Sequence, residues 1–348
     1  MPYQLEPHVV APTPPAKPEP LHSVALCTTA LSIVVVNYRR PADAISLCEQ
    51  LDQSDLIRGG QGEVILVDND DDSSTLRDWA ADRSGVRLRS LNRNNGFARA
   101  VNSGCRLARG EWILLLNPDM HVPEEFADQV LAAADRITTD NPNVGVIGFE
   151  LRHADGTAQP SAGPYPTLSN VITGIVRPRP TRRCRRQSPH AIQVPWVTGC
   201  CLLMRRKCWL ELTGFDEDFF LYYEDVDLCR RARMKGWSVW FEPSLQVTHF
   251  HPLHLRPVPP PLRLITRHAL MTYAAKHWMQ WQFRMLARLI RTEAGWRKMW
   301  ANLFGRRDAA AQFGRISNLA HDMLNGRALR ARATLNSAAR ELANEAVP

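Results

Sequence analysis

The sequence predicts an α/β fold in which a mostly parallel, Rossmann-like sheet is flanked by helices. Short apolar runs alternate with segments of helical spacing through the first third of the chain. Polar side chains stand directly after three of those runs: Asn37 and Tyr38, Asp68 and Asn69, and then the segment 117–119. Since ligands bind beyond the carboxyl ends of such strands, the three segments predict one shared site.

The individual elements follow from apolar spacing and from breaker residues. Strands are expected at residues 31–36, 63–67, 86–90, 111–116, 144–149 and 197–204, and helices at 41–51, 74–81, 97–108, 123–134, 207–212 and 224–235. Residues 238–241 and 246–248 are strand-like, whereas residues 150–195 are irregular and rich in Pro, Gly and Arg. After Pro261 the pattern changes to long helices.

Composition divides the chain into three parts. Residues 1–29 are proline-rich and are expected to be disordered, because they cannot form a packed core. Residues 30–255 form the expected α/β domain, and residues 1–255 together carry a net charge of −3. Residues 256–348 form a basic, amphipathic helical extension with a charge of +11. A near-neutral body with a basic extension predicts an anionic partner.

Several features are missing from the sequence. No apolar run approaches the roughly 20 residues that span a bilayer, and the N-terminus lacks the pattern of a secretory signal. The eight cysteines form no C-x-x-C pair, so we expect reduced thiols in a cytoplasmic protein. The absence of the dinucleotide-binding, P-loop, H-E-x-x-H and G-x-S-x-G motifs disfavours dehydrogenases, kinases, zinc proteases and serine hydrolases.

Two aspartates that follow apolar strands are candidates for ligand binding. Asp68 could accept a hydrogen bond from the N3–H of a pyrimidine, although an aspartate after a strand is also commonplace at a surface. Asp119 could ligate a hard cation that bridges a diphosphate, or could instead cap a helix. His249 follows a later strand and could supply an imidazole to the same cation.

An acidic and aromatic segment, residues 214–232, is the third candidate. Aromatic neighbours can raise the pKa of a carboxyl group toward that of a useful general base, while the start of a helix lowers it. Simple helix capping by Glu224 and Asp225 is the alternative, but it does not explain the crowded aromatic residues.

The combined motifs resemble family 2 glycosyltransferases of the GT-A fold, in the branch that includes bacterial rhamnosyltransferases. The matching pieces occur in the family's order across residues 31 to about 255: V-V-V-N-Y, V-D-N, N-x-G-F-A-x-A-x-N-x-G, L-L-L-N-P-D, F-F-L-Y-Y-E-D-V-D-L-C-R-R-A and the later His249. This resemblance implies a GT-A domain, with the helical extension following it.

The resemblance also implies a binding site for a nucleotide-sugar. The residues that would line it are Asn37, Tyr38, Asp68, Asn95, Asn102 and Asn117. Asp68 would bind the pyrimidine base, and Asn95 and Asn102 would help to hold the nucleoside or sugar. Asn117 stands at the first position of the family's D-x-D, so one negative charge is lost there, which puts strict metal dependence in doubt.

The remaining roles concern the metal and the acceptor. Asp119 and His249 would hold a divalent cation, Mg²⁺ or Mn²⁺. Asp225 would be the catalytic base. Glu224 and Trp196 would contact the acceptor, the tryptophan by stacking on a sugar.

The resemblance implies an inverting transfer from a dTDP- or UDP-sugar, with rhamnose favoured, to a saccharide or lipid-linked acceptor in bacterial cell-surface polysaccharide synthesis. A non-catalytic scaffold of the same fold and a nucleotidyltransferase are the alternatives. Interleaved Trp and Arg in the extension predict peripheral contact with an anionic membrane, on the inner face of the plasma membrane. Packing on the catalytic domain is the alternative for the extension. Nucleic-acid binding is disfavoured because no known nucleic-acid-binding motif accompanies the charge.

Overall fold

The computed structural model describes residues 29–83, 85–176, 190–250 and 258–344. The predicted disorder of residues 1–29 falls almost wholly outside these described residues. The predicted boundary between residues 255 and 256 lies outside them as well.

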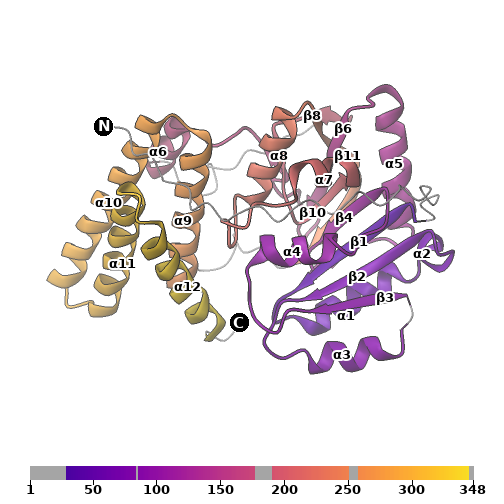
Figure 1. Cartoon of the computed structure of the whole chain (residues 1–348), viewed down its shortest axis with the longest axis horizontal. Coiled ribbons are helices and arrows are strands. Elements are labelled where there is room, and N and C mark those ends of the chain that lie inside the picture. The colour runs from indigo at the N-terminus through magenta and orange to yellow at the C-terminus, as the bar shows by residue number, and fades with distance from the viewer. Residues whose placement is uncertain (1–28, 84, 177–189, 251–257, 345–348) are drawn as a thin grey trace, which may run out of the picture.

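The centre of the molecule is a mixed nine-stranded sheet with strand order β3-β2-β1-β4-β10-β6-β11-β5, and with β8 paired to β11 (Figure 1). The strands are β1 (Leu31–Asn37), β2 (Gly62–Asp68), β3 (Val86–Ser90), β4 (Trp112–Leu116), β5 (Met120–His121), β6 (Val144–Arg152), β8 (Ile192–Gln193), β10 (Cys201–Arg205) and β11 (Ser238–His249). Strands β3, β2, β1 and β4 are parallel, as are β6 and β11. Strand β10 runs antiparallel between β4 and β6. A small second sheet pairs β7 (Ala162–Gly163) with β9 (Trp196–Val197).

Helices cover both faces of the sheet and form the C-terminal extension. They are α1 (Pro41–Leu51), α2 (Asp55–Arg58), α3 (Ser74–Ala81), α4 (Phe97–Cys105), α5 (Phe126–Asp140), α6 (Leu168–Val176), α7 (Arg206–Leu212), α8 (Glu224–Met234), α9 (Pro260–His277), α10 (Gln280–Leu303), α11 (Arg307–Leu324) and α12 (Ala328–Asn344). The predicted fold class is therefore confirmed.

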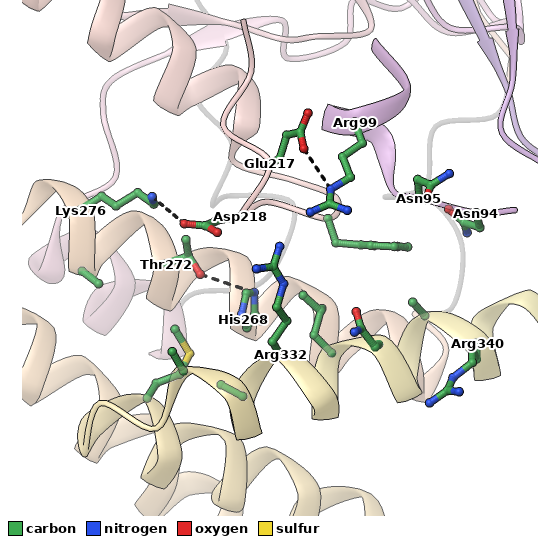
Figure 2. Close-up of a pocket in the computed structure, with 18 of the residues that line it drawn as sticks. Asn94, Asn95, Arg99, Glu217, Asp218, His268, Thr272, Lys276, Arg332 and Arg340 are labelled. Carbon is green, nitrogen blue, oxygen red and sulfur yellow. Dashed lines mark hydrogen bonds and ion pairs between the residues drawn. The ribbon is translucent and has the colours of Figure 1, made fainter. Parts of the chain in front are cut away.

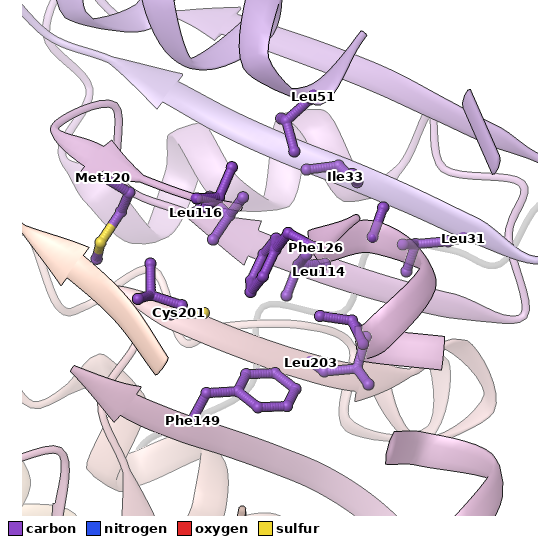
Figure 3. Packing of buried hydrophobic residues seen from close by; sticks show 14 of the residues in the cluster. Leu31, Ile33, Leu51, Leu114, Leu116, Met120, Phe126, Phe149, Cys201 and Leu203 are labelled. Atoms are coloured by element: carbon purple, nitrogen blue, oxygen red, sulfur yellow. The ribbon is translucent and has the colours of Figure 1, made fainter. Parts of the chain in front are cut away.

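Alternation of side chains along the strands creates two separate cores. Ile33 and Val35 point to the face covered by α1 and α5, where Phe126 and Phe149 meet edge to face (Figure 3). Val34 and Val36 point to the opposite face, which α4, α7 and α8 cover. Since successive residues of a strand face opposite sides, a strand that is apolar at every position must be covered on both.

The helices of the extension form a hydrophobic core that also includes Leu168 of α6, and α9 attaches them to the part of the chain that holds the sheet. The imidazole Nε2 of His277 lies 2.7 Å from Asp227 Oδ1, and Arg230 of α8 donates to the Tyr273 hydroxyl at 3.1 Å. This helix therefore packs on the domain, which agrees with the alternative expected for the extension. Within the described residues, no helix combines the length and the apolar character that crossing a membrane requires.

Three predicted strands differ from the structure. The expected strand at 197–204 is interrupted at residues 198–200, where Gly199 and Cys200 turn their backbone groups toward other segments. The two short strands expected after Ser238 are one continuous strand, β11. A register shift between Glu242 and Gln246 absorbs Pro243, which cannot donate a ladder hydrogen bond.

Candidate active site

The first candidate residue is Asp68, whose carboxylate is fully buried at the end of β2. Parallel register pairs Asn37 with Asp68, and Asn37 Nδ2 donates to Asp68 Oδ1 at 2.8 Å. Asn37 Oδ1 in turn accepts from the backbone N–H of Arg40 at 3.0 Å. Among the described residues, buried Asp68 Oδ2 has no hydrogen-bond partner. A buried acceptor without a partner is costly, so this oxygen is suited to a donor that a ligand brings.

The loop before α4 is shaped by Asn69 and by one glycine. Asn69 Oδ1 accepts from the backbone N–H of Asn95 at 2.9 Å. Gly96 has φ of 85°, and a Cβ there would lie 2.6 Å from the carbonyl oxygen of Phe220. The next backbone N–H, of Phe97, donates to that same oxygen at 2.7 Å. The glycine thus permits close contact between this loop and the segment that precedes α8.

The rest of this motif holds α4 in place. Gly104 lets the helix lie against the sheet, because a Cβ would come within 2.6 Å of Val34. The Asn102 amide bonds both backbone groups of Phe215, donating to the carbonyl and accepting from the N–H, each at 2.8 Å. The predicted donor residue Asn102 is therefore placed as a buried link between α4 and the segment before α8. Asn95 is closer to solvent, and its side chain bonds Arg93.

Tyr38 follows directly on the β1 end and is half-buried, and burial raises the pKa of its hydroxyl. Asn117 is half-buried at the end of β4, where its backbone N–H donates to the Cys200 carbonyl at 2.9 Å. Both predicted residues thus lie at the edge that also carries Asp68.

A second carboxylate, Asp119, is paired with His249 by the sheet itself. Antiparallel register sets His249 of β11 opposite Met120, directly after Asp119. His249 Nε2 lies 3.4 Å from Asp119 Oδ1. The structure therefore brings together the two residues predicted to hold a metal, which we call the metal-side pair.

Gln159 fixes the orientation of this imidazole, and sequence reasoning missed it because it lies in the stretch read only as irregular. Gln159 Nε2 donates to the carbonyls of His249 and Arg152, so its Oε1 must face His249 Nδ1, at 3.1 Å. Nδ1 then carries a proton, and Nε2 is the nitrogen that faces Asp119. A cation or a proton between Nε2 and the carboxylate makes this contact favourable, and an outer hydrogen bond such as that of Gln159 is typical of metal-binding histidines. Asp119 and His249 thus fit a divalent cation.

The electrostatics of Asp119 agree with a ligand that stays ionised. Burial disfavours its charged form, but the facing His249 and the nearby Arg40 outweigh burial and hold the pKa of Asp119 below its usual range. The described residues contain no group of three His, Cys, Asp or Glu side chains arranged for a metal.

Glu224 and Asp225, the base-side pair, open α8 in a strained setting. The two residues before them, Tyr222 and Tyr223, have φ of 74° and 67°. Bulky residues in the left-handed region cost about 1–3 kcal/mol each and cluster at functional sites. Asp225 Oδ2 accepts from the Gly199 N–H at 3.0 Å, whereas Glu224 Oε2 is buried and meets no partner in the part of the chain that the structure describes.

The pKa values of this pair are raised. Burial raises the pKa of Asp225, against the backbone N–H groups of Gly199 and Val226 that stabilise its charged form. Burial and the neighbouring Asp225 charge raise the pKa of Glu224 well above its usual range. A carboxylate with a raised pKa takes up a proton more readily, which suits a general base.

Two consecutive residues connect the metal-side and base-side pairs. Gly199 donates to Asp225, and the carbonyl of Cys200 accepts from Asn117 at the end of β4. The interruption between β9 and β10 is thus the link that places both pairs in one site. Trp196, at the start of β9, donates its indole N–H to the Pro164 carbonyl at 2.8 Å and is half-buried.

A cavity of about 1050 Å³ lies between the loop that precedes α4 and the helices of the extension. In Figure 2, Asn94, Asn95, Arg99 and Glu217 form one wall, and α9 and α12 form the other. Arg99 pairs with Glu217 across 3.2 Å. The extension therefore borders the loop that precedes α4.

Sequence comparison agrees with this geometry. The model of the family described as "Glycosyltransferase like family 2" matches residues 29–258. The chain is 32% identical over 224 residues to the N-acetylglucosaminyl-diphospho-decaprenol L-rhamnosyltransferase of Mycobacterium tuberculosis, which covers 59% of this chain and 71% of that protein. It is 24% identical over 225 residues to the rhamnosyltransferase WbbL of Escherichia coli K12, covering 63% and 82%.

Among solved structures, the mannosyltransferase PcManGT of Pyrobaculum calidifontis, in complex with GDP-Man and Mn²⁺, aligns over 89% of this chain and 86% of its own, with 18% identity and a TM-score of 0.48. The family match spans the segment that holds both carboxylate pairs. The chain therefore belongs to glycosyltransferase family 2 and is a sugar-transferring enzyme of the GT-A fold.

Proposed function

We propose that this enzyme transfers a sugar, rhamnose by similarity to its relatives, from a dTDP- or UDP-sugar to a hydroxyl group with inversion at the anomeric carbon. The observation that carries the proposal is that the pKa of Asp119 is lowered while the pKa of Asp225 is raised, on the two sides of Gly199 and Cys200. One pair is suited to hold charge beside a diphosphate, and the other is suited to take up a proton.

The donor base would bind at Asp68. Its partnerless, buried Oδ2 would accept the N3–H that uracil and thymine both present. Asn37 holds the other carboxylate oxygen and thereby fixes its orientation. In this proposal Tyr38, Asn95 and Asn117 line the nucleotide-sugar, and Asn102 acts by positioning α4.

The reaction would be a single displacement. Asp225 Oδ takes the proton of the acceptor hydroxyl while that oxygen attacks the anomeric carbon, and the bond to the nucleoside diphosphate breaks on the opposite face. A Mg²⁺ or Mn²⁺ ion held by Asp119 and His249 would supply positive charge beside the departing diphosphate. Glu224 and Trp196 would border the acceptor.

The acceptor would be a saccharide or a lipid-linked saccharide in cell-surface polysaccharide synthesis. The name of the Mycobacterium tuberculosis relative contains such a lipid-linked diphosphate. We include in the proposal a peripheral position at the anionic inner face of the plasma membrane.

A thermal-shift screen with dTDP-, UDP- and GDP-sugars, each with Mn²⁺ and with chelator, tests the donor site. A ligand at 100 times its Kd stabilises by about 2.7 kcal/mol. We expect a pyrimidine nucleotide to shift the midpoint more with Mn²⁺, and Asp68→Ala to lose that shift. The matched control, Asp78→Asn, changes an exposed aspartate on α3. An equal response to GDP- and UDP-sugars would contradict the role of Asp68. Binding without release of nucleoside diphosphate from any acceptor mixture would favour the non-catalytic scaffold.

A further inference from the structure

Helix α10 has two apolar faces, and only one of them is packed. The packed face contributes to the core of the extension through Phe283, Leu286, Ala287, Ile290, Ala294 and Ala301. These residues recur at three- and four-residue spacing, as one side of a helix does. In Figure 1 the helix lies on the side of the extension away from the sheet.

The opposite face is apolar and exposed. It carries Trp281, Met285, Trp296, Met299 and Leu303. At 3.6 residues per turn these positions fall within one stripe, roughly opposite the packed face. Trp296 is 63% exposed and Leu303 is 73% exposed. Trp300 and Phe304 adjoin the stripe and stack at 5.7 Å between ring centroids.

This concentration is unlike the rest of the described surface. Eight of the thirteen large hydrophobic residues that are exposed among the described residues lie between Met279 and Phe304. All three tryptophans in that exposed set are on α10. Isolated exposed apolar residues are normal, but a concentration of this kind on one side of a helix marks an interaction surface.

The charge beside the stripe identifies the partner. Glu293, the only acidic residue of α10, is paired with Arg267 at 3.0 Å and with Arg297 at 3.0 Å. Among the described residues, the other four cations of the helix have no ion-pair partner: Arg284, Arg288, Arg291 and Lys298. Three of them recur every seven residues and therefore form a row along one flank of the stripe.

We propose that this outer face of α10, from Trp281 to Phe304, binds the surface of an anionic lipid bilayer with the helix parallel to the membrane plane. Tryptophan and leucine would enter the interface, while the cationic row would meet acidic headgroups. A second copy of the chain fits less well. An antiparallel two-fold contact through the stripe would bring two unneutralised cationic rows together.

The proposal deepens the proposed function by naming the surface that holds the enzyme at the membrane, but its test needs neither donor nor acceptor. Full-length protein is sedimented with vesicles of phosphatidylcholine, with and without phosphatidylglycerol, at low and high salt. We expect binding only to the anionic vesicles, weakened by salt, with a blue shift of tryptophan emission.

Trp296→Ser combined with Met299→Ser should weaken vesicle partitioning by about tenfold or more, since partitioning scales with buried apolar area. Arg284→Gln with Arg291→Gln and Lys298→Gln should weaken binding to anionic vesicles only. The control, Leu329→Ser, removes a residue that is 86% exposed on α12, outside the stripe, and should bind as the wild type does.

Three results would overturn the proposal. The wild type could fail to bind anionic vesicles, or the Trp296 and Met299 double variant could bind as the wild type does. Light scattering could instead show a dimer that this double variant abolishes, which would make a second copy the occupant. Circular dichroism and the thermal shift with a pyrimidine nucleotide show whether each variant is folded.

Discussion

The metal-side pair and the base-side pair are connected through the backbone of Gly199 and Cys200, yet their pKa values shift in opposite directions. The pKa of Asp119 is lowered, and those of Asp225 and Glu224 are raised. Burial acts on both and by itself raises the pKa of each. The imidazole of His249 reverses that effect at Asp119, whereas the backbone N–H groups that Asp225 accepts from do not outweigh its burial. Both carboxylates therefore have facing groups that favour the charged form, and only at Asp119 do these groups outweigh burial.

The largest expected effect is on the base side. Asp225→Asn keeps the shape of the side chain but removes its ability to take up a proton. Since a general base contributes about 10²- to 10⁴-fold, we expect turnover to fall by that factor while the Kd for the nucleotide-sugar stays near that of the wild type. Transfer kinetics and calorimetric titration with the donor measure the two quantities.

Asp78→Asn on the exposed face of α3 is the control for Asp225→Asn and should leave both quantities unchanged. If the Asp225 variant turns over at the wild-type rate, the base is another group. If affinity for the nucleotide-sugar falls in parallel with turnover, Asp225 belongs to the binding site of the nucleotide-sugar, and the separate role of the base-side pair is contradicted.

A smaller effect is expected when the support of His249 is removed. Gln159→Met fills a similar volume but cannot accept the Nδ1 proton, so the imidazole loses its fixed orientation. Loss of such an outer hydrogen bond typically lowers metal affinity about 10- to 100-fold. Titration of Mn²⁺ in the presence of nucleotide, followed by electron paramagnetic resonance, measures the change.

The exposed Gln129 of α5 offers a matched substitution, Gln129→Met, that should not alter Mn²⁺ affinity. Turnover of the Gln159 variant should recover at high Mn²⁺ concentration, because its base is intact. Unchanged affinity in this variant, or wild-type turnover that persists in chelator, would count against a metal at Asp119.

The order of strands and helices is predictable because apolar runs that are covered on both faces are distinctive in a sequence. The grouping of Asp68, Asp119 and Asp225 is implied by motifs in a known order. The residues that hold these side chains in place are not predictable. Gln159, which orients His249, lies in an irregular stretch with no periodic signal. The buried link that Asn102 makes is equally hidden, because its partner, the backbone of Phe215, is 113 residues away in the chain.

The sequence does not decide whether the extension packs on the sheet domain or contacts a membrane, because composition does not distinguish the faces of a helix. Only the structure separates these faces. It shows that α9 packs on α8 through His277 and Asp227, and that one face of α10 remains exposed. Packing therefore describes α9, and membrane contact is proposed for α10.

The smallest expected effect concerns stability, and it tests the base side without any substrate. The folded protein holds the pKa of Glu224 above its value in the unfolded chain, so folding favours the protonated form. Its contribution to stability is present at low pH and is lost as the pH rises from the unfolded pKa through the folded one. A tenfold change in the acid dissociation constant corresponds to about 1.4 kcal/mol. In Glu224→Gln this loss is absent, so the variant should gain stability relative to the wild type as the pH rises from about 4 to 8.

Asp227, one helical turn further along α8, should show the opposite sign. Burial disfavours its charged form, but the hydrogen bond from His277 and the charge of Arg231 outweigh burial and lower its pKa. The stability that Asp227 contributes is therefore present above its unfolded pKa and is lost as the pH falls through the folded one, so Asp227→Asn should be most destabilising near neutral pH. Urea unfolding of both variants across this pH range measures the two slopes. If the slopes have the same sign, facing groups do not separate these carboxylates, and burial alone would have to explain why Glu224 and Asp225 differ from Asp119.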